Sequence, residues 1–346
     1  MKKYLTGIVT VSALMLGWSA AYSQEPVTLY VNTAGGAVND ALRKAVWDKF
    51  TAQTGIQIVD SGPADDAKLK AMVETGNTEW DLAEVNTGGF PRAIDQGLIQ
   101  KLDLTQIPTQ DLIEGSYNDY GVWHSPYSTV LAWDTRLWPL SGKHPTSMMD
   151  LWNQKDFPGP RCMYKSATDT LEVGALHAGV AQDKLYPIDQ DAAYKELDKL
   201  KPDVSVWWTT GAQSVQALLN QDCVMGMVWN GRPFQMVRHE NAPFGVAWEG
   251  NILHNSWWVI PKGAKHYKEA MQLLVAMQDP QAQAEYASIV GYASGNKLTD
   301  QYLADDVKLF LATSPEHVEQ AIKADDSWWN TNGPAAEQRF NNWLIQ

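Results

Sequence analysis

The fold is decided by a stretch that begins with Val27-Thr28-Leu29-Tyr30-Val31 and ends with Trp80-Asp81-Leu82-Ala83-Glu84-Val85. Short apolar runs at both ends predict strands, and a third strand is predicted over residues 56–59. Apolar residues at helical spacing predict helices over residues 38–54 and 64–74, between these strands. The resulting βαβαβ order is typical of a mostly parallel sheet with helices on both faces. Ligands bind beyond the carboxyl ends of such strands.

A second group of elements begins at Tyr127-Ser128-Thr129-Val130-Leu131-Ala132-Trp133-Asp134, a strand-like run where the first pattern stops. Because a chain of 346 residues exceeds the size of a single hydrophobic core, we expect two lobes. A return crossing is expected near residues 246–251. The predicted lobes comprise residues 24–131 with 250–305, and residues 132–249 with 306–346. The other predicted strands are 162–165, 224–229 and 256–261, and the other predicted helices are 170–181, 191–200, 213–220, 267–277 and 280–289.

The first 23 residues have the pattern of a secretory signal peptide. Met1-Lys2-Lys3 precedes an apolar segment from Tyr4 to Trp18, and small residues close on Ala21-Tyr22-Ser23. We expect cleavage before Gln24 and a mature protein in the periplasm. The alternative is an uncleaved membrane anchor, but a spanning helix needs about 20 apolar residues. No Cys follows the apolar segment, so a lipoprotein-type anchor has no acceptor.

The composition argues against a nucleic-acid partner. There are 27 Lys and Arg against 40 Asp and Glu, a net charge of −13. No basic cluster is present to replace the counterions of a phosphate backbone. The chain also has 16 Trp, and so many amphipathic rings suggest that several line a ligand cleft. In the adjacent pairs Trp207-Trp208 and Trp328-Trp329, we expect one ring to pack inward and the other to face cleft or solvent.

The chain has two cysteines, Cys162 and Cys223. An oxidising compartment favours pairing of an even number of cysteines, so we expect a disulfide. Each precedes a strand-like run, and neighbouring strands of one sheet could bring the two together. Closing about 60 residues would stabilise the fold by a few kcal/mol. Two buried free thiols are the alternative, and a metal site lacks the usual CxxC or HxxxH spacing.

Common catalytic motifs are absent from the sequence, including GxSxG, HExxH, the P-loop and GxGxxG. The seven His are scattered. His124 or His254 with some Ser and Asp would be the nearest approach to a hydrolytic arrangement, and their spacing does not support it. These absences argue against several common classes of enzyme, so we do not expect an enzyme, a cofactor or a metal site, and an enzyme on an α/β scaffold is the alternative.

Four stretches of the chain resemble a known family. They are Asp81-Leu82-Ala83-Glu84-Val85-Asn86, the run from Tyr127 to Asp134, Gly226-Met227-Val228-Trp229-Asn230-Gly231-Arg232, and Asn255-Ser256-Trp257-Trp258-Val259-Ile260-Pro261-Lys262-Gly263-Ala264. Their order is similar to that of periplasmic solute-binding proteins of ABC transporters, in the cluster that includes spermidine- and putrescine-binding proteins. The resemblance implies an α/β, two-lobed periplasmic binding protein of type II with a ligand cleft between the lobes. It also implies a small-molecule solute, an inner-membrane ABC permease as partner and a monomeric chain.

The class of solute depends on two positions. Arg232 follows a strand and a glycine, so its guanidinium could take a carboxylate at the cleft mouth, or form a surface or interlobe ion pair instead. Polyamine binders of the resembled family have an acidic residue where this chain has Asn255, which is neutral. This departure favours an amino acid of the 4-aminobutyrate kind or a betaine over a polyamine. A small carboxylate without an amine is the alternative.

Further contacts are expected at strand ends and on aromatic side chains. Trp229 and Trp257 could offer flat faces to an alkyl or cationic group, or fill the lobe cores. Asp169 lies where the resembled family's second lobe offers polar side chains, but an N-cap role is the alternative. Glu84, near a strand end, could also balance a ligand amine. Five residues could donate or accept hydrogen bonds in the cleft or simply form turns, namely Asn32, Thr33, Asn86, Thr87 and Ser128.

Overall fold

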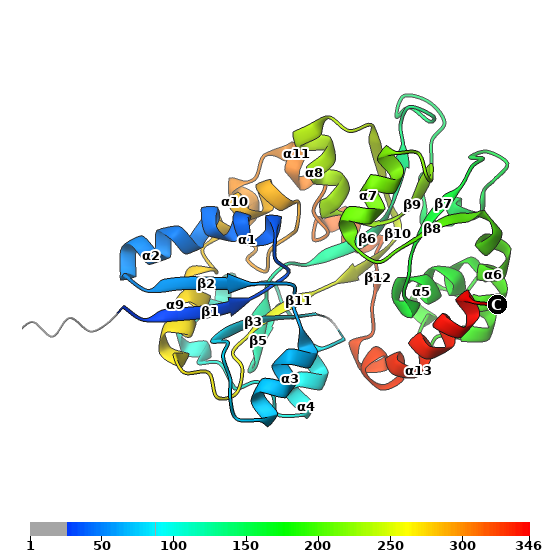
Figure 1. Ribbon diagram of the computed structural model, residues 1–346. Coiled ribbons are helices and arrows are strands. Elements are labelled where there is room, and N and C mark those ends of the chain that lie inside the picture. The colour runs from blue at the N-terminus through cyan, green and yellow to red at the C-terminus, as the bar shows by residue number, and fades with distance from the viewer. Residues whose placement is uncertain (1–25, 87) are drawn as a thin grey trace, which may run out of the picture.

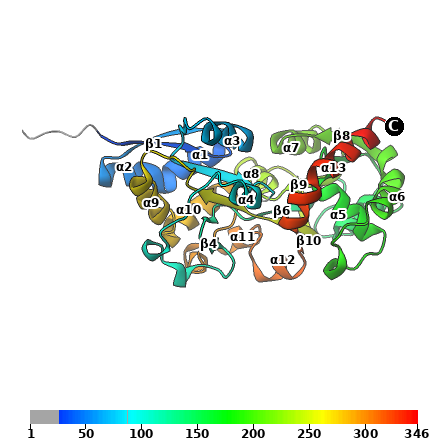
Figure 2. The same cartoon turned by 90° about the horizontal axis from the view of Figure 1, so that it is seen from below.

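Two six-stranded sheets form the framework of the computed structural model, which describes residues 26–86 and 88–346. The predicted signal peptide and Thr87 lie outside the described residues. The first sheet has the order β2 (Gln57–Ser61), β1 (Thr28–Asn32), β3 (Leu82–Asn86), β11 (Ser256–Val259), β5 (Gly121–Trp123) and β4 (Tyr117–Asn118). The second has the order β12 (Ile322–Lys323), β10 (Phe244–His254), β6 (Tyr127–Asp134), β9 (Met225–Trp229), β7 (Arg161–Tyr164) and β8 (Val204–Trp208). We call the two bodies built on these sheets the first lobe and the second lobe, and they lie side by side (Figures 1 and 2).

The predicted βαβαβ order of the first lobe is confirmed. β1 is parallel to both β2 and β3, whereas β11 runs antiparallel to β3 and β5. A continuous helical run joins β1 to β2, and Gly55 ends it in the left-handed conformation at φ 76°, which favours glycine. The run consists of α1 (Ala37–Leu42), a π-helical segment (Arg43–Trp47) and α2 (Asp48–Thr54). Between β2 and β3, α3 (Asp66–Glu74) begins at Asp65, whose carboxylate accepts a hydrogen bond from the Lys68 amide.

Helices cover the sheets of both lobes (Figure 1). The other α-helices are α4 (Phe90–Asp95), α5 (Ala167–His177), α6 (Gln190–Leu200), α7 (Gly211–Leu219), α8 (Gly231–Glu240), α9 (Tyr267–Ala276), α10 (Pro280–Val290), α11 (Asp305–Lys308), α12 (Pro315–Glu319) and α13 (Asp326–Leu344). Within the described part of the chain, none of the helices has the length and apolar character needed to cross a bilayer. Nine of the described strands and α-helices had no counterpart among the sequence predictions, namely the strands β4, β5, β8 and β12 and the helices α4, α8, α11, α12 and α13.

Within the described residues the chain changes sheets three times, and the first two changes lie close to the cleft. β6 pairs along its length with β9 and, in two stretches, with β10, so the first change precedes Tyr127. β10 ends at His254 and β11 begins at Ser256, so Asn255 alone separates a strand of the second sheet from a strand of the first. The lobe boundaries given above stay a prediction. The strand pairing places these first two changes of sheet next to residues that line the cleft.

Large aromatic side chains fill the core of each lobe. Trp47 and Trp258 are buried in the first lobe, and Trp133 and Trp208 are buried in the second. Trp208 donates its Nε1 hydrogen bond to the carbonyl of Met227, 3.0 Å away, so its polar end is satisfied inside the core.

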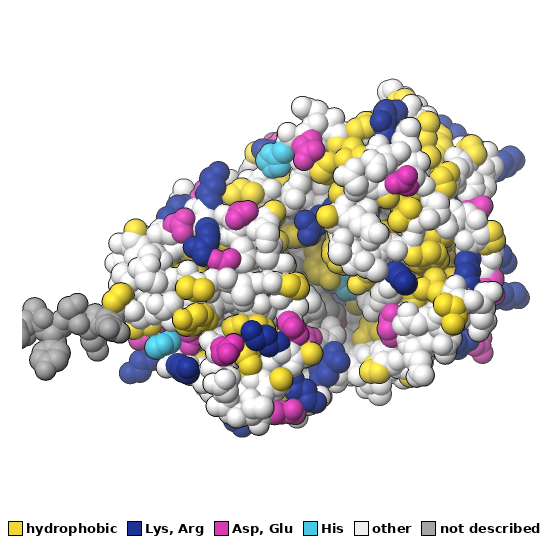
Figure 3. Space-filling view, viewed as in Figure 1, with side chains coloured by type: hydrophobic (Ala, Val, Ile, Leu, Met, Phe, Trp, Pro, Cys, Tyr) yellow, Lys and Arg dark blue, Asp and Glu magenta, His cyan; other side chains and the backbone are white. Residues whose placement is uncertain are grey.

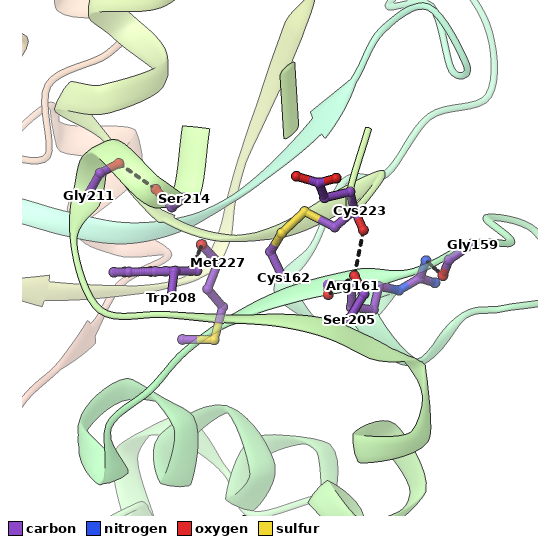
Figure 4. The surroundings of a disulfide bond; sticks show 10 residues. Gly159, Arg161, Cys162, Ser205, Trp208, Gly211, Ser214, Cys223 and Met227 are labelled. Carbon is purple, nitrogen blue, oxygen red and sulfur yellow. Dashed lines mark hydrogen bonds between the residues drawn. A yellow bond between two sulfur atoms is a disulfide. The ribbon is translucent and has the colours of Figure 1, made fainter. Parts of the chain in front are cut away.

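The predicted disulfide joins Cys162 on β7 to Cys223, two residues before β9. β7 and β9 are parallel neighbours, and this pairing leaves the two Cα atoms 5.6 Å apart. Figure 4 shows the bridge between these two segments. Both half-cystines are buried, and the bridge spans a sequence separation of 61 residues. The reasoning from neighbouring strands is therefore confirmed, and free thiols are ruled out in this structure.

Candidate functional site

A cavity of about 490 Å³ lies between the lobes. Figure 3 shows the molecule hollowed between its two halves, with hydrophobic side chains inside the hollow. The lining comes from both sheets: Glu84 and Asn86 lie at the carboxyl end of β3, and Trp229 lies at the carboxyl end of β9. This is the position expected for a ligand site in an α/β protein.

Arg232 reaches the cavity because the chain turns sharply after β9. Asn230 is fully buried and fixes this turn: its Oδ1 accepts from the Ser128 amide, and its Nδ2 donates to the carbonyls of Gly291 and Phe310. The next residue must be small, since a Cβ at Gly231 would lie 2.4 Å from the Tyr292 ring. α8 then begins and presents Arg232 in its first turn.

The guanidinium of Arg232 has no internal carboxylate partner among residues 26–86 and 88–346. Its Nε is buried and makes no hydrogen bond in this part of the chain. Gly211 allows the guanidinium to fit, because a Cβ there would lie 2.6 Å from that Nε. A buried donor without a partner is costly, so this atom is poised to donate to an acceptor that enters the cavity.

Aromatic rings surround the same space. Trp229 meets Tyr127 and Tyr164 edge to face, with ring centroids 6.1 Å and 5.6 Å apart. Tyr127 also meets Tyr292 edge to face at 6.1 Å. Burial raises the pKa of the Tyr127 hydroxyl well above its usual range, and the Asp169 carboxylate adds to this effect, so the phenol stays neutral. These rings give the cavity apolar walls that suit an alkyl chain or a cationic head group.

The first carboxylate of the site is Glu84, which is 7% exposed. It accepts hydrogen bonds from Thr33 Oγ1 at 2.6 Å and from the Ala34 amide at 2.8 Å, and both end on Oε2. His124 Nε2 lies 3.8 Å from the same oxygen. Burial lowers the pKa of His124 despite the opposing effect of Glu84, so the ring is neutral near pH 7. The His124 ring therefore supplies no positive charge to offset the Glu84 carboxylate.

The second carboxylate is Asp169, which is 1% exposed and lies in the first turn of α5 with φ 70°. Ser166 precedes α5 and its hydroxyl accepts from the Thr168 amide, but Thr168 and Asp169 have non-helical backbone angles, so regular helix begins after Asp169 and its N-cap alternative stays open. Asp169 Oδ2 accepts from Thr129 Oγ1 at 2.5 Å, and Oδ1 lies 2.6 Å from His254 Nε2. Burial opposes a charge on His254, but the Asp169 carboxylate outweighs it and raises the pKa of the ring.

A third carboxylate, Glu172, stands behind the wall of the cavity. It is fully buried and accepts hydrogen bonds from Tyr186 Oη and Trp329 Nε1, each at 2.7 Å. Burial raises the pKa of Glu172 to about 7, and the nearby Asp169 charge contributes. Trp329 in turn lines the cavity, so Glu172 holds an aromatic part of the site in place.

Five of the residues that the sequence offered as solute contacts line the cavity together, namely Glu84, Asn86, Asp169, Trp229 and Arg232. Thr33 is not among the lining residues, but its hydroxyl donates a hydrogen bond to Glu84, which is one of them. Asn32 is buried and donates to Ser61 Oγ and the Pro63 carbonyl, and Ser128 is buried on β6. These side chains support the cavity wall, and their direct contact with a solute stays a prediction.

Two other predicted contacts, Trp257 and Asn255, are not among the lining residues, and their contact with a solute stays a prediction. Trp257 is buried in the first-lobe core, stacked on Phe90 with ring centroids 4.1 Å apart, and is not among the cavity-lining residues. Asn255 lies between β10 and β11 and is likewise outside the lining.

The sequence predictions missed several residues that line the site. His254 follows a long strand and lies next to Asn255, so its position at a strand end was the available signal. The residues are His124, Tyr127, Tyr164, His254, Tyr286, Tyr292 and Trp329. Within residues 26–86 and 88–346, no three side chains of His, Cys, Asp or Glu are grouped to hold a metal ion.

Comparison with known proteins identifies the family. The model of the bacterial extracellular solute-binding proteins matches residues 45–310. The Gamma-aminobutyric acid-binding protein of Pseudomonas aeruginosa is 33% identical over 96% of this chain and 95% of its own length. The Spermidine/putrescine-binding periplasmic protein of Escherichia coli is 26% identical, over 97% and 96%.

Solved structures agree with this result. An ABC transporter substrate-binding protein from Bradyrhizobium japonicum superposes with a TM-score of 0.85 at 33% identity, covering 92% of this chain and 99% of its own. A GABA receptor structure superposes with a TM-score of 0.83 at 33% identity, covering 92% and 97%. The expected two-lobed α/β fold is thereby confirmed. With a matching family model over most of its length and a cavity between two lobes, the chain belongs to the bacterial extracellular solute-binding proteins.

Proposed function

We propose that this protein captures a small zwitterionic solute, with 4-aminobutyrate as the model compound, and delivers it to an ABC permease. The observation that carries this proposal is the buried Arg232 Nε, which has no internal acceptor in the described part of the chain although it lines the cavity. A solute carboxylate would supply that acceptor through a charge-assisted hydrogen bond. The relative named for gamma-aminobutyric acid supports the same class of solute.

Glu84 is the proposed partner of the solute's ammonium group. Among residues 26–86 and 88–346, the donors to Glu84 both reach Oε2, so Oε1 is available to a donor in the cavity. The aromatic rings of Tyr127 and Trp229 would cover the carbon chain between the two charged ends. A betaine would use the same arginine and replace the hydrogen bond to Glu84 with contacts to these rings.

Capture would work by closure of the two lobes over the solute. Glu84 belongs to the first lobe and Arg232 to the second, so a solute that contacts both favours the closed form. At the rim the two lobes meet directly, where Asn330 Nδ2 on α13 donates to Asp95 Oδ2 on α4 at 3.4 Å. We infer that the chain does this in the periplasm as a monomer and carries out no catalysis. The signal-like first 23 residues support export.

The test is isothermal titration of the mature protein with 4-aminobutyrate, glycine betaine and 1,4-diaminobutane. Arg232→Ala should weaken binding of 4-aminobutyrate by at least tenfold, the lower end of what a hydrogen bond to a charged group contributes. Arg238→Ala is the matched control, because Arg238 lies on the same helix and pairs with Asp306 at the surface. Unchanged affinity in Arg232→Ala, or wild-type binding of the diamine alone, would contradict the proposal.

A further inference from the structure

The two carboxylates that line the cavity differ in how many of their oxygens are available. Within the part of the chain that the structure describes, Glu84 accepts hydrogen bonds from Thr33 and Ala34, and both end on Oε2. Asp169 has each oxygen engaged, Oδ2 by Thr129 and Oδ1 by His254. The cavity therefore contains two negative side chains and one open place for a solute ammonium group.

The contact between Asp169 and His254 is short and protected from water. Nε2 of His254 lies 2.6 Å from Oδ1 of Asp169, and the two side chains are 3% and 2% exposed. The Tyr127 ring stacks on the imidazole, with centroids 5.1 Å apart and planes 27° apart. These contacts fix the ring between the end of β10 and the first turn of α5.

Three carboxylates act on the imidazole from the elements around it. Asp169 and Glu172 belong to α5, and Asp326 belongs to α13. Burial raises the pKa of Glu172 and of Asp326 to about 7 each, so both are partly protonated at neutral pH. Asp169 is the carboxylate in contact, and it raises the pKa of His254 against the opposing effect of burial.

We propose that His254 is a specificity-determining residue: its ring supplies a built-in cation that occupies Asp169 and thereby excludes solutes with two ammonium groups. A linear diamine would place one ammonium at Glu84 and bring the other toward Arg232 or toward an Asp169 that is already neutralised. Neither place offers a free anion, and burying a second cation without one is strongly unfavourable. A zwitterion meets no such penalty. This inference rests on the proposed function only in that solutes bind in this cavity.

The experiment compares two solutes of equal carbon count, 4-aminobutyrate and 1,4-diaminobutane, by isothermal titration. His254→Gln keeps a hydrogen-bond donor but removes the cation, so Asp169 is freed to pair with an ammonium. We expect the affinity for 1,4-diaminobutane to rise at least tenfold over wild type. His124→Gln is the matched control, because this buried His also lines the cavity but is neutral, and its Nε2 lies 3.8 Å from Glu84, too far for a hydrogen bond. It should gain no diamine affinity.

A double variant tests whether the gain in diamine affinity comes from the freed Asp169 charge or from a change in cavity volume. In His254→Gln/Asp169→Asn the cavity has nearly the same volume as in the single variant, but the freed carboxylate is gone. The gain in diamine affinity should disappear. A gain that persists in the double variant, a wild type that already binds the diamine as tightly as the variant, or a folded His254→Gln without any gain would each overturn the proposal.

A measurement on the wild type covers the case in which His254→Gln fails to fold. The NMR signals of ring-labelled histidine should show His254 as an imidazolium at pH 7.5, where an ordinary histidine is neutral. A neutral His254 ring at this pH would overturn the proposal. The two proposals also fail separately: absence of 4-aminobutyrate binding in wild type contradicts the proposed function, whereas the diamine results decide the role of His254.

Discussion

Arg232 and Asp169 line the same cavity, yet the protein treats the two charges in opposite ways. Both oxygens of Asp169 are engaged by internal donors, whereas the Nε of Arg232 has no acceptor within the described residues. The carboxylate is thus part of the fold's own bonding, and the guanidinium is left for a solute. The difference teaches that the charge available to a ligand is decided by which groups are already paired, not by which groups are present.

The largest difference between the two charges should appear in the free energy of unfolding of variants that remove one or the other. Asp169→Ala should lower the free energy of unfolding by about 3–5 kcal/mol, because it leaves the buried His254 cation without its partner. Arg232→Ala should change it by less than about 0.5 kcal/mol, since no internal ion pair is lost. Urea denaturation of both variants measures this. Equal losses of stability would show that the two charges are not used differently.

The second prediction concerns Glu172, a buried carboxylate whose ionisation should destabilise the folded protein. The pKa of Glu172 is raised from 4.5 to about 7 in the folded protein, mainly by burial. Below about pH 4.5 both folded and unfolded states are protonated. As pH rises to about 7 the unfolded state ionises first, so stability is lost across this window.

Glu172→Gln should remove this loss, so the variant should gain about 2–3 kcal/mol on wild type between pH 4.5 and 8. Thermal or urea unfolding across this range measures the slope. Glu196→Gln is a control of opposite sign, because Lys199 lowers the pKa of Glu196. Parallel pH profiles for wild type and Glu172→Gln would mean that Glu172 titrates normally.

The smallest expected effect concerns Glu84, which has one oxygen engaged by internal donors and the other available to a solute. Thr33→Val removes the hydroxyl that donates to Oε2 at 2.6 Å while keeping nearly the same volume. The free energy of unfolding should fall by about 1 kcal/mol, because the Ala34 amide still donates to the same oxygen. The affinity for 4-aminobutyrate should change little, since Oε1 is untouched. A large loss of affinity with unchanged stability would place Thr33 in direct contact with the solute.

Much of the framework could be predicted from the sequence because its determinants are local. Short apolar runs, a helical repeat and Gly55 defined the βαβαβ unit, and the Cys162–Cys223 bridge followed from two strand-like runs expected to be neighbours. Arg232 was found because a strand, a glycine and a long cation occur in that order. These signals need no knowledge of the third dimension.

The remaining parts of the site depend on contacts that are distant in sequence. Trp257 and Trp258 alternate on β11, but helices cover both faces of this sheet, so both rings are buried and polarity does not tell which face meets the cleft. The pairing of His254 with Asp169 joins residues 85 positions apart. The spacing of residues in the sequence does not predict that His254 pairs with Asp169.

The two tryptophans on the cavity wall have a practical consequence. Trp229 lies beside the side chain of Arg232, since a Cβ added to Gly211 would lie within 3 Å of both side chains. Trp329 donates its indole hydrogen bond to Glu172. Indole emission responds to local polarity and to nearby charge. A carboxylate that binds at Arg232 changes both the polarity and the charge near Trp229. The intrinsic tryptophan fluorescence of the unlabelled protein should therefore report solute binding.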